Sequence, residues 1–200
     1  MGDETGMDTD VAAAPRVWPR VKWTRAGQVA PLLGAQPDLA AIGGMSPAAA
    51  FSVLRESDPM GAARFMAQCL PRVDAARWVA ACLAEADANP PPARAVAAKA
   101  VRRWVSHPTD DARRLAYDAG GMAGWETMEG MACLAIFLSG GSLAPAAQEQ
   151  PVNPPPGAFG QAAAGAVLLA ASFDGVPAFA GKLAGMLARA DAIAAGEQLA

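Results

Sequence analysis

The chain has 200 residues, of which 53% are apolar and 18% are charged, and its formal net charge is −3. This length and composition suit one globular domain and exclude a wholly disordered chain. The sequence pI near 5.1 argues against general nucleic-acid binding, which requires a basic surface, so no nucleic-acid partner is expected.

The first fifteen residues predict a disordered acidic tail, because four acids and no base occur among the first ten. Residues 16–45 predict an irregular arm, in which Trp18 and Trp23 are interleaved with basic side chains. Tryptophans among bases could stack on a nucleic acid, but no further basic surface supports that interpretation. We favour an arm that packs against its own domain, and we keep Trp18 and Trp23 as candidate partner-binding residues.

Residues 58–87 predict two amphipathic helices that meet at a proline corner. Asp58-Pro59 is a helix cap followed by a first-turn proline, and Pro71 restarts the chain after the first helix. Apolar residues recur at helical spacing in both halves. Trp78 falls on the apolar side of the second helix, so the pattern predicts that it is a core residue.

The next predicted helix spans residues 92–106, after a run of three prolines. Its apolar stripe is expected to face inward, and its basic residues are expected to form an outer face. Such a face is typically solvated, and partner binding is the alternative. The predicted inner stripe consists of Val96, Ala100, Val101, Trp104 and Val105. The predicted outer face consists of Arg94, Lys99, Arg102 and Arg103, of which Arg94, Arg102 and Arg103 are candidate partner-binding residues.

Five further helices complete the prediction. The first is a short helix that Ser46-Pro47 caps and that runs to about Glu56. The others cover residues 109–121, 124–138, 158–172 and 177–195, and a proline-rich connection at 143–157 follows the helix at 124–138. No stretch shows sustained strand alternation. The sequence therefore predicts an all-α protein, a compact array of about seven or eight helices with helix–turn–helix corners, in a single domain over residues 16–200.

No set of side chains predicts a catalytic, cofactor or metal site. His107 is the single histidine, and the adjacent carboxyls of Asp110 and Asp111 diverge on a helix. The turn at Ser139–Ser142 could hold an anion on its backbone N–H groups, but it follows a helix C-terminus, where the dipole is negative. A helix cap is the favoured interpretation of that turn.

Location and membrane contact can also be predicted from the composition. The three cysteines lie in apolar helical patterns, which indicates reduced, buried thiols in the cytoplasm: Cys69, Cys82 and Cys133. The opening residues are acidic where a signal peptide would be basic. Two uncharged runs, residues 130–148 and 158–173, are too short or too interrupted to span a membrane, so no membrane insertion is expected.

Three segments resemble an uncharacterised bacterial family. They are LPRVDAARWVAAC at 70–82, HPTD at 107–110, and FLSGGSLAP at 137–145 with the prolines that follow. The family has an LPRREAVWW-like helix start and an SGGSLAP-like turn. This chain departs from that pattern at Val73-Asp74 and at Arg77, where the family has the first of two adjacent tryptophans. A role for a tryptophan pair is therefore not expected here. The resemblance covers roughly residues 20–195 and implies an association with type VI secretion genes, without an activity.

The leading hypothesis is a non-enzymatic, cytoplasmic helical module that binds other proteins. The resemblance makes it an accessory or adaptor of a bacterial type VI secretion system. A small-ligand-binding helical protein, with a pocket near Trp78, Trp104 and Trp125, is the main alternative. An enzyme that uses His107 with Asp110 or Asp111 is the less favoured one.

Overall fold

The structure is a computed structural model, and it describes residues 16–34, 40–145 and 147–197. These residues form eight α-helices and two short 3-10 helices, with no strand, which confirms the all-α prediction. The predicted acidic tail lies outside the described residues. The elements are η1 (Ala26–Gln28), η2 (Ala30–Leu32), α1 (Pro47–Ser57), α2 (Pro59–Cys69), α3 (Arg72–Ala86), α4 (Pro92–Ser106), α5 (Asp110–Ala123), α6 (Met128–Phe137), α7 (Ala158–Ser172) and α8 (Val176–Ala194).

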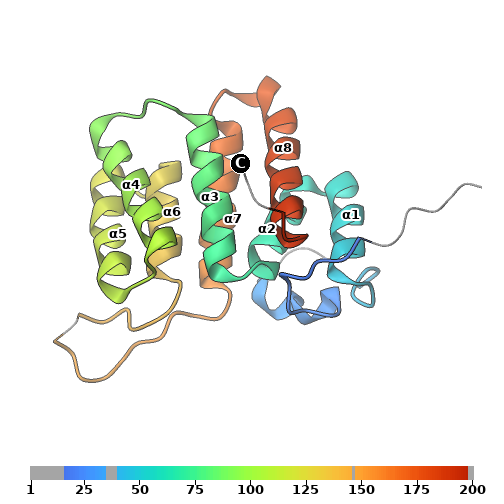
Figure 1. The fold of residues 1–200 in the computed structure, drawn as a ribbon, viewed down its shortest axis with the longest axis horizontal. Coiled ribbons are helices and arrows are strands. Elements are labelled where there is room, and N and C mark those ends of the chain that lie inside the picture. Colours follow the sequence, from blue (N-terminus) through green and yellow to red (C-terminus); the bar gives the residue numbers. More distant parts are fainter. Residues whose placement is uncertain (1–15, 35–39, 146, 198–200) are drawn as a thin grey trace, which may run out of the picture.

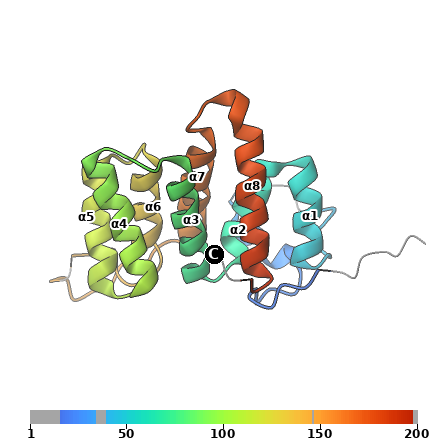
Figure 2. The same cartoon turned by 45° about the horizontal axis from the view of Figure 1, so that its top comes forward.

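The helices stand side by side in a row that runs from α5 at one end to α1 at the other (Figure 1). Helices α4, α5 and α6 pack on one another at one end, and α1, α2 and α8 lie towards the other (Figure 2). Helix α7 joins the two groups, because it contacts α2, α3, α6 and α8. It has no charged residue, and most of its residues are alanine or glycine, which allows neighbouring axes to approach closely.

Helix α6 is central in its half of the row, as its apolar character predicts. It contacts α3, α4, α5 and α7. It begins later than residue 124, because Thr127 is its N-cap and accepts a hydrogen bond from the Gly130 amide at 3.0 Å. Trp125 therefore precedes the helix and is half-buried.

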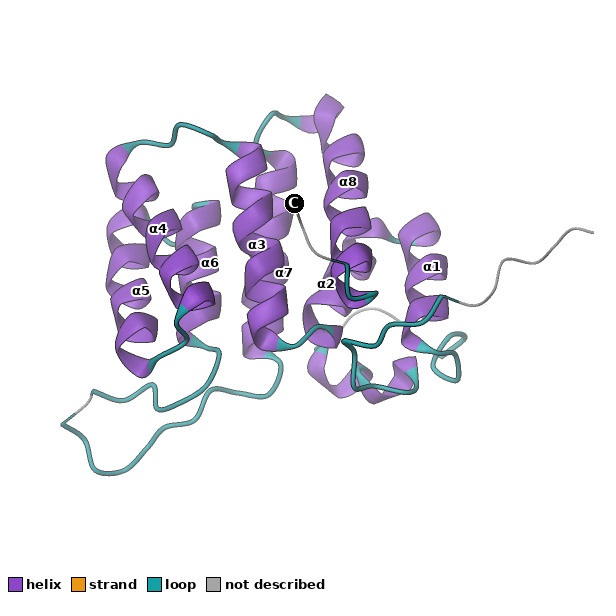
Figure 3. Cartoon of the chain, viewed as in Figure 1, coloured by secondary structure: helices purple, strands orange, loops and turns teal. Residues whose placement is uncertain are grey.

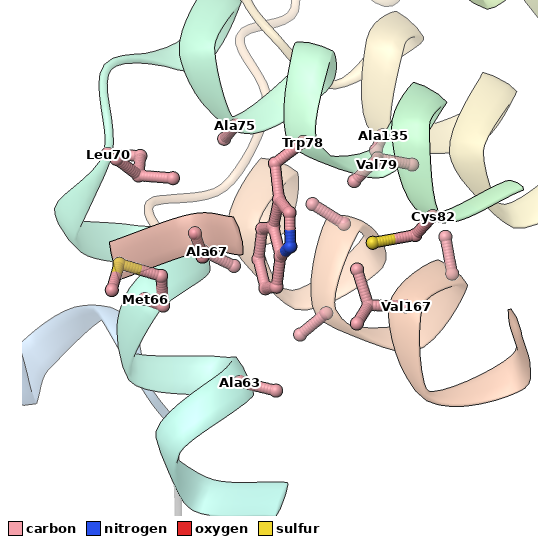
Figure 4. Close-up of a cluster of buried hydrophobic side chains, with 14 of the residues drawn as sticks. Ala63, Met66, Ala67, Leu70, Ala75, Trp78, Val79, Cys82, Ala135 and Val167 are labelled. Atoms are coloured by element: carbon pink, nitrogen blue, oxygen red, sulfur yellow. The ribbon is translucent and has the colours of Figure 1, made fainter. Parts of the chain in front are cut away.

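The corner between α2 and α3 places Trp78 at the centre of the core (Figure 4). The indole is 0% exposed and lies between α2, with Ala63 and Met66, and α7, with Val167. Its Nε1 donates a hydrogen bond to the Met186 carbonyl of α8 at 2.8 Å. The prediction that Trp78 belongs to the core is confirmed, and the space around it is filled by side chains.

The arm before α1 packs against the domain. Trp18 is buried, its Nε1 donates to Asp191 Oδ1 at 2.8 Å, and its ring lies 5.4 Å from that of Phe51. Trp23 is half-buried and donates to the Gln68 carbonyl at 3.2 Å. The packed arm agrees with the favoured interpretation. Trp18 is thus a core residue, and its indole is not available on the surface.

The predicted inner stripe of α4 is wrong only at Val96, which is 50% exposed, while Ala97 is buried. Val101 and Trp104 are buried as predicted, and Ala100 and Val105 pack half-buried against the core. Arg94 shares this inward face and does not belong to an outer basic face. Its guanidinium donates two hydrogen bonds to Glu129 of α6, at 2.8 and 3.0 Å. Arg94 faces inward because the Glu129 carboxylate is only 1% exposed, and a buried carboxylate requires a cation beside it.

None of the helices formed by the described residues is long and apolar enough to cross a membrane.

Candidate partner-binding site

A long irregular segment, residues 139–157, connects α6 to α7 and reaches beyond the end of the bundle (Figure 3). We call it the anchored loop. Its residues 147–153 are all exposed, including Val152 at 48%. Loops of this length without secondary structure are uncommon in compact domains and are often functional.

Arg113 of α5 fixes the start of the anchored loop. Although it is an arginine, its side chain is buried, and its guanidinium is fully used. Nη1 donates to the Phe137 carbonyl and Nη2 to the Ser142 carbonyl, both at 2.8 Å, while Nε donates to Asp110. The guanidinium also lies 4.7 Å from the centre of the Phe137 ring. The Phe137 carbonyl at the end of α6 is therefore satisfied by a charged donor.

Arg114 adds a second attachment one residue later. It donates to the Ala144 carbonyl at 3.0 Å and to the Ser142 carbonyl at 3.3 Å. Asp110 accepts hydrogen bonds from both arginines, at 2.8 Å each. The hydrogen bonds from Arg114 and Arg113 lower the pKa of the Asp110 carboxyl. One carboxylate thus orients both arginines towards the loop.

The two sides of the anchored loop are joined at its neck. The Leu143 amide donates to the Val152 carbonyl at 2.7 Å. Ser142 Oγ accepts from the amides of Ala144 and Val152 at 3.1 and 3.0 Å. Gly141 adopts φ +70°, a conformation that favours glycine, and a Cβ there would lie 3.2 Å from Asp110 Oδ1. The base is therefore rigidly specified, while the tip projects into solvent.

The segments that carry the family resemblance meet at this end of the bundle. Thr109 caps α5 by accepting from the Ala112 amide at 3.2 Å, which positions Asp110. Arg72, at the start of α3, lies beside the glycine turn, because a Cβ on Gly140 would be 3.5 Å from its Nη1. Segments 70–72, 107–110 and 139–145 are far apart in sequence and adjacent in the fold.

Two of the predicted partner-binding residues are exposed near the anchored loop. Arg102 and Arg103 lie in the last turn and a half of α4, whose C-terminal end is at the same end of the bundle as the loop (Figure 1). Within the described ranges, no carboxylate oxygen lies within 4.0 Å of their guanidinium nitrogens, and the same holds for Arg72. This end therefore presents three exposed, unpaired cations.

The structure also places the other sequence-predicted groups. His107 is exposed at the C-cap of α4, and Asp111 is exposed at the start of α5. In the part of the chain that the structure describes, no group of three or more histidine, cysteine, aspartate or glutamate side chains could hold a metal ion. In the Ser139–Ser142 turn the Ser142 carbonyl accepts from Arg113 and Arg114, and the C-cap of α6 is Leu138, the residue before the turn.

The cysteines are free and buried. Burial raises the pKa of the Cys82 and Cys133 thiols to about 12, and it raises that of Cys69 as well. A reactive thiolate requires a lowered pKa, so these raised pKa values do not fit reactive cysteines.

The lowered pKa of Asp110 predicts a pH dependence. A carboxyl whose pKa falls on folding stabilises the protein at neutral pH, and this stabilisation is lost as the pH drops through the folded-state pKa. Asp110→Asn should therefore lower the melting temperature at neutral pH. The difference from the wild type should shrink below the usual titration range of aspartate. Thermal unfolding at stepwise pH measures this, and a difference that persists at strongly acidic pH would contradict it.

Sequence reasoning missed Arg113 and Arg114 as functional residues. They were expected to continue the helix after Asp110, without a role. Their spacing of three and four residues from Asp110 was a usable signal, because such pairs meet on a helix face. Their contacts with the loop could not be inferred, because the hydrogen bonds join residues 24 to 30 positions apart.

The fold and the site together define an all-α protein with a projecting loop held by arginines. The chain belongs to the family of unknown function DUF6931, whose family model matches residues 51–194. The matched range runs from α1 to the end of α8 and includes the anchored loop, while Trp18 and Trp23 lie before it. A search of the curated proteins gave no match, and a search of the solved structures gave none.

Proposed function

We propose that this protein is a non-enzymatic, cytoplasmic helical module that binds another protein through the anchored loop and the cations beside it. The observation that carries the proposal is the arrangement of the loop. Three arginine hydrogen bonds to the Ser142 and Ala144 carbonyls hold its base, and its tip is exposed. A loop held this way presents main-chain and side-chain groups to a partner. Because its base is already ordered, the loop loses little conformational entropy when it binds.

The composition of the loop favours protein recognition. Its prolines restrict the backbone to extended conformations, which dock readily on another protein surface. Val152 provides an exposed apolar contact at the neck. Arg72, Arg102 and Arg103 would meet acidic side chains, since complementary charge steers association and fixes orientation.

The resemblance supplies a cellular setting for this proposal. The LPR, PTD and SGGSLAP-like segments carry a resemblance that implies an association with type VI secretion genes, so the partner would be a component or an effector of that apparatus. The protein would then act as an accessory or adaptor. This part of the proposal depends on the resemblance, whereas the binding surface depends on geometry.

Affinity purification of the tagged protein from its own host tests the function. The wild type should recover one partner at near-stoichiometric yield. Replacing residues 147–151 by an equally long glycine–serine segment should remove that partner, because these residues are exposed and the neck hydrogen bonds remain. The double variant Arg102→Glu, Arg103→Glu should weaken recovery at least tenfold, which is about 1.4 kcal/mol.

A matched control is Arg55→Glu, an exposed arginine on α1 at the other end of the row. It should recover the partner as the wild type does. Recovery of no stoichiometric partner by the wild type, or equal recovery by the loop variant, would overturn the proposal. If the recovered partner had no connection to type VI secretion, the proposed binding surface would stand and the proposed adaptor role would be wrong.

A further inference from the structure

A pocket separate from the anchored loop lies between α2 and α7. Its volume is about 420 Å³, within the range of small-molecule sites. Its described lining combines apolar groups with a few polar ones, and its floor is formed by small residues of α7. The lining includes Leu33, Arg64, Gln161, Ala164, Gly165 and Leu168.

Hydrogen bonds fix the walls of this pocket. Gln68 donates to the Leu32 carbonyl at 3.0 Å and to the Gly157 carbonyl at 2.8 Å, so one side chain joins the arm to the start of α7. Gly160 makes room for this amide, because a Cβ there would lie 2.3 Å from the Gln68 side chain. The wall beside Leu33 is therefore preorganised, which lowers the entropic cost of binding a ligand.

Small and apolar residues of α7 line one side of the pocket. At Gly165 a Cβ would lie 3.3 Å from Met131 Cγ, so the missing side chain lets α6 and α7 approach closely. Ala164 is buried and small, and Leu168 is half-buried. This side of the pocket is therefore apolar, and it suits a hydrocarbon chain or ring.

Arg64 gives the pocket its charge. It is half-buried on α2, and no carboxylate oxygen of the described residues lies within 4.0 Å of its guanidinium. A partly desolvated guanidinium gains from a carboxylate, which it can bind through two parallel hydrogen bonds. A single cation on an apolar floor matches a ligand with one negative charge, and a multiply charged ligand would lack partners.

We propose that this pocket binds a small organic monocarboxylate, with its carboxylate on Arg64 and its apolar body on Ala164, Gly165 and Leu168. Gln161 is exposed at the edge, and its Nε2 donates to the Leu32 carbonyl at 3.4 Å, so its second N–H would supply a further polar contact. The described lining of the pocket contains no residue of the anchored loop, although Gln68 is hydrogen-bonded to Gly157, the last residue of that loop.

Isothermal titration calorimetry with three probes of similar shape tests this assignment. The probes are octanoate, the neutral octanamide and the cationic octylamine. Wild-type protein should bind octanoate saturably at one site and prefer it to octanamide by about tenfold or more. Arg64→Gln should remove that preference, because both head groups then meet a neutral amide.

Two further variants distinguish the site from non-specific binding. Arg55→Gln, an exposed arginine of α1, should leave the preference unchanged. Leu168→Ser should weaken octanoate and octanamide by a similar factor, because it removes part of the apolar floor. Circular dichroism of each variant checks folding. Equal binding of octanoate and octanamide by the wild type, no saturable binding at all, or an unchanged preference in Arg64→Gln would overturn the proposal.

Discussion

Replacing Trp78 by alanine is expected to lower the free energy of unfolding by about 3–5 kcal/mol. The indole is fully buried among α2, α3 and α7, and removing it leaves a cavity that alanine-rich helices have few large side chains to fill. The Met186 carbonyl would also lose its hydrogen bond from Nε1. Because small domains have only about 5–15 kcal/mol of stability, this change should remove much of it.

Urea unfolding followed by circular dichroism measures this effect. Trp125→Ala is the matched control, since Trp125 is half-buried outside the helices, next to Tyr117, with ring centres 5.1 Å apart. Its loss should be clearly smaller than that of Trp78→Ala. If the two variants unfolded at the same urea concentration, Trp78 would not be at the centre of the core.

Removing Arg94 should destabilise the protein almost as strongly. Arg94→Met would leave the Glu129 carboxylate, which is 1% exposed, without its cation. Breaking a buried pair in this way costs about 3–5 kcal/mol. The hydrogen bond that Arg94 donates to Glu129, together with the charges of Glu129 and Asp87, raises the pKa of Arg94, so the guanidinium stays charged at neutral pH. Arg94 also forms an ion pair with Asp87 at the end of α3, with 3.3 Å between Nη2 and Oδ2.

The double variant Arg94→Met, Glu129→Leu tests the cause. Replacing both members by apolar side chains of similar size should recover most of the loss, because no buried charge remains. Arg103→Met, on the exposed side of the same helix, should stay within about 0.5 kcal/mol of the wild type. A double variant as unstable as the single one would show that Arg94 acts through packing and not through charge.

The starts of several helices could be predicted because their signals are local, whereas the start of α6 could not. Ser46, Asp58 and Thr109 each accept a hydrogen bond from a backbone amide three residues later, as capping residues do. The complete inward face of α4 could not be predicted from its sequence pattern. Alanines occupy both sides of that helix, so the position of Val96 alone did not define the inward stripe.

The candidate site could be predicted only in part. The proline-rich connection and the exposure of Arg102 and Arg103 were inferred from composition and spacing. The attachment of the loop by Arg113 and Arg114 depends on how α5 packs against α6, which no local pattern contains. The pocket beside Arg64 likewise requires α2, α7 and the arm to meet, and the sequence pointed to the tryptophans instead.

Site-specific photo-crosslinking in the native host tests most directly whether the anchored loop is the partner surface. A photoreactive amino acid would replace Val152 in the loop or, as the control, Val53 of α1 at the other end of the row. The two valines are similarly exposed, at 48% and 42%. We predict one discrete crosslinked protein from position 152 and none from position 53. Equal crosslinking at both positions, or a discrete product from position 53 alone, would contradict the proposed surface.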